Sequence, residues 1–474
     1  MATQIKFGTD GWRAIIAEDF TFDNVRICAQ AVADYMKESG LARQGLVIGY
    51  DTRFASEDFA DASAEVAAAN GIKTYLCNMA APTPVISYAV KLKNAGGGIV
   101  ITASHNPGRW NGFKYKQEGG HSVSTDVIAN LEGNISRIQT CGKLERITLD
   151  QAINKGSVEK FDPNPQYMQQ IKRLVDVEGL RHSGLKVVVD SMYGAGGGYF
   201  ASLLGGSTTE VIEIHGERNP AFPGLQPEPI AQNLKQLSER IKGEGASVGL
   251  ATDGDADRIG IMDEKGRFLT TLEVFALLSL YLLDTCGKRG AIIKTITSSN
   301  MLYRLGEIYG VPVHETPVGF KYVAPKMIAE DALIGGEESG GFAFRGHIPE
   351  RDGILAGLLF LDFMIREEKS PSQLLQHLFS KVGPHYYNRT DIKFPPDKRQ
   401  SIIDRLSKTR PKQIKNVSVS KIDTSDGFRF LMADGSWLLI RFSGTEPIMR
   451  VYSESNSPEK VESFLTVGKE MTGV

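Results

Sequence analysis

Cysteine is scarce in this chain of 474 residues, with only four in all. Cys28, Cys77, Cys141 and Cys286 are far apart, and no pair has the C-x-x-C spacing of a zinc ribbon. So few and so scattered cysteines exclude a disulfide scaffold, and they are typical of a protein that works in a reducing compartment.

Long hydrophobic runs are also missing. The longest apolar stretches are residues 274–283 and 354–365, and Asp362 interrupts the second. Both are shorter than the roughly 20 residues that a helix needs to cross a bilayer. The first ten residues contain no apolar segment either. We therefore expect a cytoplasmic protein without a membrane partner.

The chain has no excess of one charge, because 54 Lys and Arg oppose 56 Asp and Glu, which gives a net charge of −2. This balance argues against nucleic acid or an anionic membrane as the main partner, but it allows local basic pockets for small phosphates. Hydrophobic residues make up 41% and charged residues 23%, so a disordered or fibrous chain is excluded.

Glycine is abundant, with 50 residues, and strand-like runs alternate with helix-like stretches over most of the length. This alternation predicts layered α/β domains. The sequence predicts a helix at 56–69 and buried strands at 46–50, 97–102, 185–190, 247–252 and 291–295. Three successive segments share the strand–loop unit, which suggests a repeated domain.

The last segment has a different pattern. Alternating strand patterns at 417–422, 428–432 and 437–441 precede a helical pattern at 458–471. This order predicts a smaller α+β domain at the C-terminal end.

Thr102-Ala-Ser-His-Asn-Pro107 follows one of the buried strands. α/β folds place reactive groups at the carboxyl ends of strands, so Ser104 is a candidate nucleophile with His105 or Lys114 nearby. The glycines of a G-x-S-x-G nucleophile elbow are absent. Taken alone, the segment is read better as an ordinary turn, because Asn-Pro ends regular structure.

Asp253-Gly-Asp-Ala-Asp-Arg258 is more informative. Carboxylates at every second position converge if the loop curls, and such oxygen clusters suit Mg²⁺. An EF-hand is excluded because Arg258 occupies the position that requires glycine. An arginine beside a metal site makes sense if a phosphate completes the coordination. The alternative is a solvated acidic turn.

Two further loops carry weaker signals. Residues 335–341 pair carboxylates with a hydroxyl, as recognition of sugar hydroxyls requires, although a charged surface turn has the same composition. Residues 441–450 combine two arginines, two hydroxyls and a glycine, which makes a plausible phosphate cradle that is not a P-loop. The glycine cluster at 194–198 does not satisfy G-x-G-x-x-G, so a dinucleotide site there is not expected.

Together and in this order, the four loops resemble those of the α-D-phosphohexomutase family, which includes phosphoglucomutases, phosphomannomutases and phosphoglucosamine mutases. The resemblance covers essentially the whole chain. Phe7-Gly-Thr-Asp-Gly-Trp-Arg13, Gly49-Tyr-Asp-Thr-Arg53 and Thr316-Pro-Val-Gly-Phe-Lys321 match the family as well. The resemblance implies four domains around a central cleft, three similar mixed α/β domains and a smaller C-terminal α+β domain. We place them at 1–155, 156–260, 261–380 and 381–474.

The resemblance also implies roles for individual residues. Ser104 would carry a phosphoryl group, and Asp253, Asp255 and Asp257 would hold Mg²⁺ together with an oxygen of that phosphoserine. Four residues would surround the phosphoryl group in transfer, namely Arg13, His105, Lys114 and Arg258. The substrate would be bound by Thr316, Gly319, Lys321, Glu337, Ser339, His347 and Arg351, and its own phosphate by Arg441, Ser443, Gly444, Thr445 and Arg450.

The implied activity is that of a phosphoglucomutase, which interconverts glucose 1-phosphate and glucose 6-phosphate through glucose 1,6-bisphosphate as activator and intermediate. Phosphomannomutases tend to have G-E-M-S-G-H, and here Gly341 replaces the final histidine. Phosphoglucosamine mutases typically have V-G-D-R where this chain has Val318-Gly-Phe-Lys321. Both differences favour glucose among the possible hexose phosphate partners.

Alternatives stay open. The same site could belong to a glucose-1,6-bisphosphate synthase, to a phosphomannomutase or dual-specificity phosphohexomutase, or to a catalytically silent sugar-phosphate sensor, although intact Ser104 argues against the last. Some phosphoglucomutases have lysine where Arg351 stands, and arginine cannot act as a base at ordinary pH. Lys114 and His347 are therefore candidates for the general base. The protein is expected to be a monomer or a homodimer.

Overall fold

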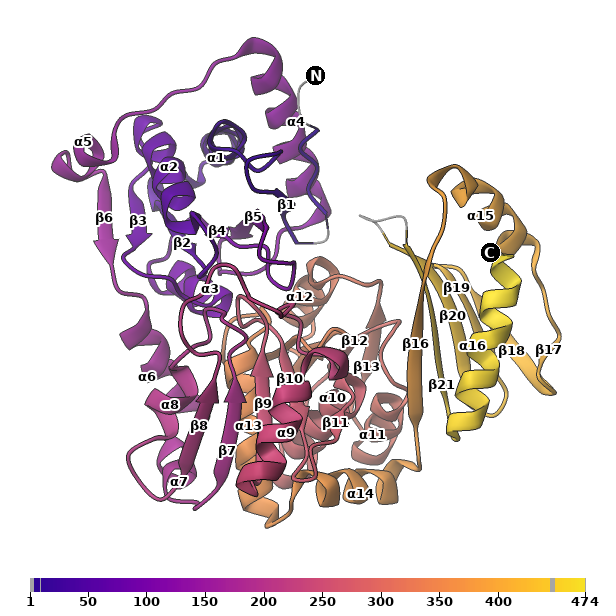
Figure 1. Ribbon diagram of the computed structural model, residues 1–474. Coiled ribbons are helices and arrows are strands. Elements are labelled where there is room, and N and C mark those ends of the chain that lie inside the picture. The colour runs from indigo at the N-terminus through magenta and orange to yellow at the C-terminus, as the bar shows by residue number, and fades with distance from the viewer. Residues whose placement is uncertain (1–3, 9, 444–447, 474) are drawn as a thin grey trace.

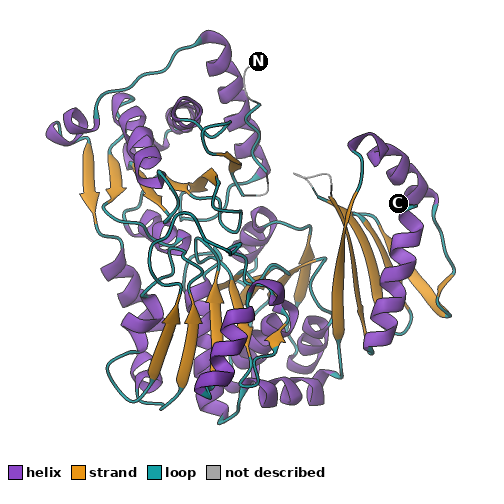
Figure 2. Ribbon diagram, viewed as in Figure 1, coloured by secondary structure: helices purple, strands orange, loops and turns teal. Residues whose placement is uncertain are grey.

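Three of the four sheets described in the computed structural model share one plan, in which parallel strands run to one edge and antiparallel strands complete the other (Figures 1 and 2). The structure describes residues 4–8, 10–443 and 448–473. The fourth sheet is antiparallel throughout. The prediction of three similar α/β domains and a smaller C-terminal α+β domain is confirmed.

The first sheet has the order β1-β5-β4-β2-β3-β6, and helices cover both of its faces. Helices α1 and α2 pack together on one face, and α3 packs against the strands β2 and β4 from the other. The strands are β1 Trp12–Ile15, β2 Leu46–Tyr50, β3 Thr74–Cys77, β4 Gly97–Ile101, β5 Trp110–Gln117 and β6 Val158–Phe161. The helices are α1 Phe22–Glu38, α2 Ser56–Ala69, α3 Thr83–Leu92, α4 Thr125–Cys141 and α5 Leu149–Asn154.

The second sheet has the order β11-β10-β9-β7-β8. Its strands are β7 Lys186–Asp190, β8 Glu210–Ile214, β9 Val248–Thr252, β10 Ile259–Met262 and β11 Phe268–Leu269. The helices of this part are α6 Asn164–Leu174, α7 Val177–Arg181, α8 Tyr199–Leu204 and α9 Lys235–Glu244.

The third sheet has the order β13-β12-β14-β15. Its strands are β12 Ile292–Thr295, β13 Val313–Thr316, β14 Ile334–Gly336 and β15 Phe342–Phe344. The helices are α10 Thr271–Leu280, α11 Met301–Tyr309, α12 Phe320–Ala329, α13 Gly353–Glu367 and α14 Pro371–Val382.

The fourth sheet lies to one side of the others, and α16 covers one of its faces (Figure 1). Its order is β16-β21-β20-β19-β18-β17. The elements are β16 Tyr386–Lys393, α15 Arg399–Lys408, β17 Gln413–Ile414, β18 Val417–Asp423, β19 Phe428–Met432, β20 Trp437–Phe442, β21 Ile448–Ser455 and α16 Pro458–Thr472.

Two sheets extend past the domain boundaries placed from the sequence. Strand β6 begins at Val158 and pairs with β3 of the first sheet, beyond the boundary at 155. Strands β10 and β11 belong to the second sheet and run past the boundary at 260. Pairing partners decide where a sheet ends, and a single sequence does not show them.

The two longest apolar runs of the sequence form buried helices. Every residue of α10 is buried, as are Gly353–Met364 of α13, and the two helices contact each other. A helix that is apolar on all sides is one that is covered on all sides. Thr270 and Glu273 form a capping box that begins α10. Among the described residues, no helix is both long and apolar enough to cross a membrane.

An ion-pair cluster joins the third sheet to the fourth. Glu315 on β13 accepts hydrogen bonds from Lys294 on β12 at 2.8 Å and from Arg429 on β19 at 2.7 Å. Burial by itself would raise the pKa of Glu315, but the two cations outweigh it and lower the pKa from 4.5 to about 2. Trp437 packs beside this cluster against Ile296.

We expect Glu315→Gln to destabilise the protein by about 3 kcal/mol at pH 7, because two cations lose their counter-charge in a buried place. A carboxylate with a lowered pKa stabilises the fold above about pH 4.5 and loses that contribution as the pH falls toward 2. The difference between variant and native protein should therefore shrink between pH 5 and pH 3. Urea unfolding followed by tryptophan fluorescence measures it, since Trp437 reports on this junction.

The matched control is Glu307→Gln, which removes an exposed pair with Arg304 at 3.0 Å and should cost less than about 1 kcal/mol. A Glu315→Gln deficit that stays constant from pH 7 to pH 3 would contradict the assignment.

Candidate active site

Ser104 lies directly beyond the carboxyl end of β4 and is almost fully buried. Its backbone has φ 51°, in the left-handed region that residues other than glycine rarely adopt. The Ser104 Oγ–H donates to Asp253 Oδ2 at 2.7 Å. The serine loop of the first sheet and the aspartate loop of the second sheet therefore meet at this hydroxyl.

The three predicted aspartates form one cluster in the loop after β9. Asp253, Asp255 and Asp257 are buried, and each has a carboxylate oxygen within 4.8 Å of the others. Asp255 Oδ1 and Asp257 Oδ1 are buried without a hydrogen-bond partner. Burial, followed by the neighbouring carboxylates, raises the pKa of Asp253 well above its ordinary value. Unpartnered oxygens from crowded carboxylates are the donor set that a divalent cation such as Mg²⁺ takes, so these residues fit a metal ion.

Lys114 on β5 lies against the same carboxylates. Its Nζ is 2.6 Å from Asp10 Oδ2, 2.8 Å from Asp255 Oδ2 and 3.4 Å from Asp257 Oδ2. Burial would lower the pKa of Lys114, but these three carboxylates outweigh it and raise the pKa above its ordinary value. Lys114 is therefore held as a cation.

Arg351, in the loop before α13, closes the cluster from the third sheet. Its Nη2 is 2.6 Å from Asp10 Oδ2 and 2.8 Å from Asp257 Oδ2, and its Nη1 is 3.5 Å from Glu337 Oε2. Although burial opposes it, the surrounding carboxylates raise the pKa of Arg351 further. The residue is a permanent cation that joins the metal-binding candidates to the sugar-binding loop.

Two arginines and one imidazole lie at or within the serine loop, and they have few hydrogen-bond partners. Arg258 Nε lies 4.0 Å from Asp253 and 3.9 Å from Asp257 and has no hydrogen bond. Arg13 Nη1 donates to Asn106 Oδ1 at 2.8 Å. Burial, followed by nearby arginines, lowers the pKa of His105 well below its ordinary value, so its imidazole is neutral at pH 7. Such groups can accept an anion between them.

The sugar-binding candidates lie in a tight turn after β14. Glu337 N donates to Gly341 O at 3.1 Å, and Gly340 within the turn has φ 89°. Burial raises the pKa of Glu337. Ser339 Oγ is buried and has no partner. The turn thus presents a carboxylate and a hydroxyl that can bind hydroxyl groups of a ligand.

Some of the phosphate-binding candidates of the fourth sheet lie within the described residues. Arg441 on β20 and Arg450 on β21 are register partners and so share one face of the sheet. Arg441 Nε donates to Asp426 Oδ1 at 3.0 Å, and Arg450 Nε lies 3.6 Å from Asp391. Ser443 N donates to Ile448 O at 2.8 Å. Gly444 and Thr445 lie outside the described residues.

The loop after β13 contacts the same part of the fourth sheet. Val318 N donates to Asp426 Oδ2 at 2.8 Å, and Gly319 begins α12 with φ 130°. Burial, followed by the neighbouring Arg441, lowers the pKa of Lys321. Thr316 Oγ1 donates to Pro317 O at 3.0 Å. Lys321 and Arg441 thereby bring positive charge from two domains together.

His347 contacts residues that hold the fold together at the start of α13. Its Nε2 lies 3.0 Å from Asp352 Oδ2, its ring stacks on Tyr88 at 5.5 Å, and its side chain is fully buried. Tyr167 also donates to Asp352, at 2.9 Å. These contacts hold the start of α13 in place.

Sequence reasoning named no role for Asp10, Thr83, Lys116 or Glu350. Asp10 bridges Lys114 and Arg351, and Thr83 donates to Asp255 Oδ2 at 2.6 Å. Lys116 and Glu350 form a fully buried pair at 2.8 Å between the first and third domains. Asp10 stands within the motif Phe7–Arg13, which gave some signal, whereas nothing in the sequence pointed to the other three.

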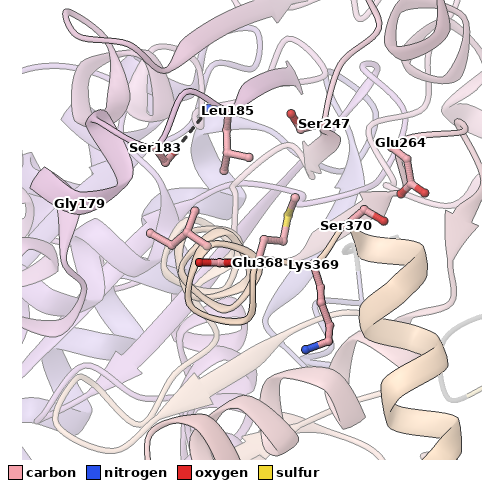
Figure 3. A pocket seen from close by; sticks show the side chains of 10 residues that line it. Gly179, Ser183, Leu185, Ser247, Glu264, Glu368, Lys369 and Ser370 are labelled. Carbon is pink, nitrogen blue, oxygen red and sulfur yellow. Dashed lines mark hydrogen bonds between the residues drawn. The ribbon is translucent and has the colours of Figure 1, made fainter.

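A separate cavity of about 520 Å³ lies between the second sheet and the end of α13 (Figure 3). Ser183, Ser247, Glu264 and Lys369 line it, and none of the predicted site residues does. Its polar side chains are engaged within the protein, for example Glu264 with Ser372 and Lys369 with Glu367 at 2.9 Å. It has no cluster of free polar groups comparable to that at Ser104.

Known proteins resemble this chain over its full length. Models of the phosphoglucomutase/phosphomannomutase family match it in order: alpha/beta/alpha domain I at residues 4–141, domain II at 165–266, domain III at 272–382 and the C-terminal domain at 400–466. A phosphoglucomutase/phosphomannomutase from Thermococcus kodakarensis is 34% identical over 462 residues, which cover 98% of this chain and 97% of that protein.

Two further relatives carry other names. A probable phosphoglucosamine mutase from Methanothermobacter thermautotrophicus is 32% identical over 96% of this chain and 94% of its own length. The crystal structure of a putative phosphomannomutase from Thermus thermophilus matches with a TM-score of 0.86 and 33% identity over all of both chains. With four family domains in order and relatives of this similarity, the chain belongs to the phosphoglucomutase/phosphomannomutase family.

Proposed function

We propose that the protein is a phosphoglucomutase that interconverts glucose 1-phosphate and glucose 6-phosphate through a phosphoserine at Ser104. The observation that carries the proposal is the hydrogen bond from Ser104 Oγ to Asp253, which puts a buried hydroxyl at the edge of a carboxylate cluster that fits Mg²⁺. Arg13 and Arg258 supply positive charge for a phosphoryl group beside it.

Asp253, Asp255 and Asp257 would hold the Mg²⁺ ion, whose chemistry when bound is to offset negative charge on the phosphoryl oxygens. The protein adds fixed charge of its own. Arg258 lies next to Asp253 without a hydrogen bond at Nε, so it can turn toward phosphate oxygens. A phosphoserine carries a charge of about −1.5 to −2, which repels an approaching phosphorylated sugar unless cations surround it.

The reaction then needs two phosphate sites. In the first half, a sugar hydroxyl attacks phosphorus, its O–P bond forms, and the bond between phosphorus and Ser104 Oγ breaks. The bisphosphate turns over, and Ser104 Oγ attacks its other phosphoryl group, which releases the second monophosphate. Arg441, Arg450 and Lys321 would grip the phosphate that is not in transfer, with Ser443, Gly444 and Thr445, while Glu337 and Ser339 bind sugar hydroxyls in either orientation.

The charge states bear on which group accepts the hydroxyl proton. Lys114 and Arg351 are held protonated by Asp10, Asp255 and Asp257, so neither takes a proton at neutral pH. His105 is neutral and has a buried Nδ1 without a hydrogen-bond partner. We therefore assign the acceptor to His105 and an electrostatic role to Lys114. His347 also has an unbonded Nδ1, but its Nε2 is engaged with Asp352 and its ring is stacked on Tyr88.

Glucose is proposed as the preferred sugar because Gly341 and Phe320-Lys321 depart from the mannose-type and glucosamine-type patterns. The relatives are named for glucose, mannose and glucosamine phosphates, so all three sugars belong in the assay.

We expect Ser104→Ala to lower turnover of glucose 1-phosphate by about a thousandfold or more, because the carrier oxygen is lost, while binding of the sugar phosphate persists. ³¹P NMR of protein, Mg²⁺, glucose 1-phosphate and trace glucose 1,6-bisphosphate measures turnover, and calorimetry measures binding. Ser87→Ala is the control, since Ser87 is also a buried serine of the first domain but lies in α3.

Native protein that forms glucose 6-phosphate rapidly at catalytic bisphosphate supports the mutase. Slow isomerisation, with stoichiometric glucose 1,6-bisphosphate formed from excess fructose 1,6-bisphosphate, would show a bisphosphate synthase instead. Full activity in Ser104→Ala would overturn both.

We expect Asp255→Asn to weaken Mg²⁺ binding by more than about tenfold, because a carboxylate of the cluster becomes a neutral amide. Calorimetric titration of Mg²⁺ into the protein without sugar measures this directly. Asp284→Asn, a partly exposed aspartate paired with Lys381 at 3.0 Å, should leave the affinity unchanged. Equal Mg²⁺ affinity of Asp255→Asn and native protein would contradict the metal site.

A further inference from the structure

Arg53 is a fully buried arginine that points at the backbone of the serine loop. Its side chain has no exposed surface, yet both terminal nitrogens of its guanidinium face main-chain oxygens. Arg53 Nη2 donates to Ser104 O at 2.5 Å and to Asn106 O at 2.6 Å. Arg53 Nη1 donates to Pro107 O at 2.9 Å and to Trp110 O at 3.0 Å. One side chain thus ties four carbonyls of one loop together.

Asp51 links this arginine to the other side of the loop. Its Oδ2 lies 3.2 Å from Arg53 Nε and accepts from Thr102 Oγ1 at 2.6 Å. Thr102 Oγ1 in turn accepts from Ser104 N at 2.9 Å. The peptide groups on both sides of Ser104 are therefore fixed by side chains, its N–H through Thr102 and its carbonyl through Arg53.

The backbone of Ser104, which these bonds fix, has an unfavourable left-handed conformation. Ser104 has φ 51°, which an L-residue holds only when its surroundings impose it. The aspartate loop adds to this restraint, because a Cβ on Gly254 would lie 2.4 Å from Ser104 O. The bonds from Arg53 and Thr102 supply the enthalpy that keeps the left-handed backbone in place.

The position of Arg53 excludes a direct role on phosphate. Phe222, from the loop between β8 and α9, covers the guanidinium with its ring centroid 4.9 Å from Arg53 Cζ. Four of the five N–H donors of an arginine are taken by backbone carbonyls. The fifth donor, Nε, lies 3.2 Å from Asp51 Oδ2, and the buried side chain gives a substrate phosphate no access.

We propose that Arg53 is the positioning residue of the nucleophile: it holds the Ser104 backbone in the left-handed conformation that directs Oγ at Asp253. The inference rests on the proposed role of Ser104 as phosphoryl carrier. A lysine keeps the charge but presents one ammonium in place of the planar fork, so it cannot span four carbonyls.

The step that depends on this positioning is the loading of Ser104. Ser104 Oγ attacks a phosphorus atom of glucose 1,6-bisphosphate, the Oγ–P bond forms and the sugar O–P bond breaks. The serine proton ends on the sugar oxygen that leaves. An attacking oxygen displaced by about 1 Å can lose about a hundredfold in rate.

The experiment compares Arg53→Lys and Thr102→Val with the native protein in two assays. Single-turnover labelling with ³²P-glucose 1,6-bisphosphate gives the loading rate, and steady-state kinetics give kcat and KM. We expect Arg53→Lys to load about a hundredfold more slowly, with a fall in kcat and an unchanged KM for glucose 1-phosphate. Thr102→Val, which is nearly isosteric, should lower kcat by about tenfold and leave KM unchanged.

Leu131→Ala is the matched control, because it weakens the core of the first domain from α4 without touching the loop. It should lower Tm and leave the loading rate unchanged. If Arg53→Lys does not fold, Thr102→Val decides the question.

Native-like loading in Arg53→Lys, or in Thr102→Val where only that variant folds, overturns the inference. So does a loss of rate that is matched by an equal rise in KM, since that would mean altered substrate binding. A native protein that takes up no label would overturn the proposed function itself, which separates the two failures.

Discussion

Everything at this site depends on balancing four crowded carboxylates, three of which are fully buried. Asp253, Asp255 and Asp257 come from one loop, and Asp10 comes from the first domain. Like charges this close, away from water, repel strongly unless cations lie between them. Lys114 from β5 and Arg351 from the loop before α13 supply that charge at 2.6–3.4 Å from Asp10, Asp255 and Asp257. Because the cations belong to other domains than the aspartate loop, the same electrostatic balance that builds the site also joins the domains.

This charge balance leaves several polar atoms of the site without a hydrogen bond. Among the described residues, Asp255 Oδ1, Asp257 Oδ1 and Arg258 Nε have no hydrogen-bond partner, and neither has Ser339 Oγ in the sugar loop. A metal ion, a phosphoryl group and a sugar hydroxyl are the ligands that would satisfy them. The fully bonded groups, such as Arg53 and the pair of Lys116 with Glu350, hold the loops that present the open ones.

The junction with the fourth sheet also depends on carboxylates that are paired with cations from other segments. Glu315 is bonded by Lys294 and Arg429, and Asp426 joins Arg441 to Val318 N. These contacts align the arginine face of β20 and β21 with the loop after β13. Two phosphates of one bisphosphate would then meet separate positive sites in separate domains, which is what a reaction with a reorienting intermediate needs.

Much of the fold was predictable, because central strands such as β2, β4 and β9 are continuous apolar runs and several strands of the fourth sheet alternate. The predicted strands at 46–50 and 428–432 coincide with β2 and β19, and the helix at 56–69 with α2. The pairing of β6 with β3 could not be read from the sequence, since strand pairing depends on distant segments. The three aspartates could be named from their local pattern, whereas the role expected for Ser104 came from the resemblance of the four loops taken together.

The sequence by itself determined the succession of α/β units before a C-terminal α+β unit, and the chemical nature of each loop, because these follow from local composition and spacing. Only the tertiary structure decided the charge states and partners. Lys114 resembles a general base in sequence, yet three carboxylates from two loops hold it protonated. The substrate-binding role of His347 stays a prediction, and the partners that the structure gives it are Asp352 and Tyr88. A proton's free energy depends on charges and burial a few ångströms away in space, and those neighbours are up to hundreds of residues away in the chain.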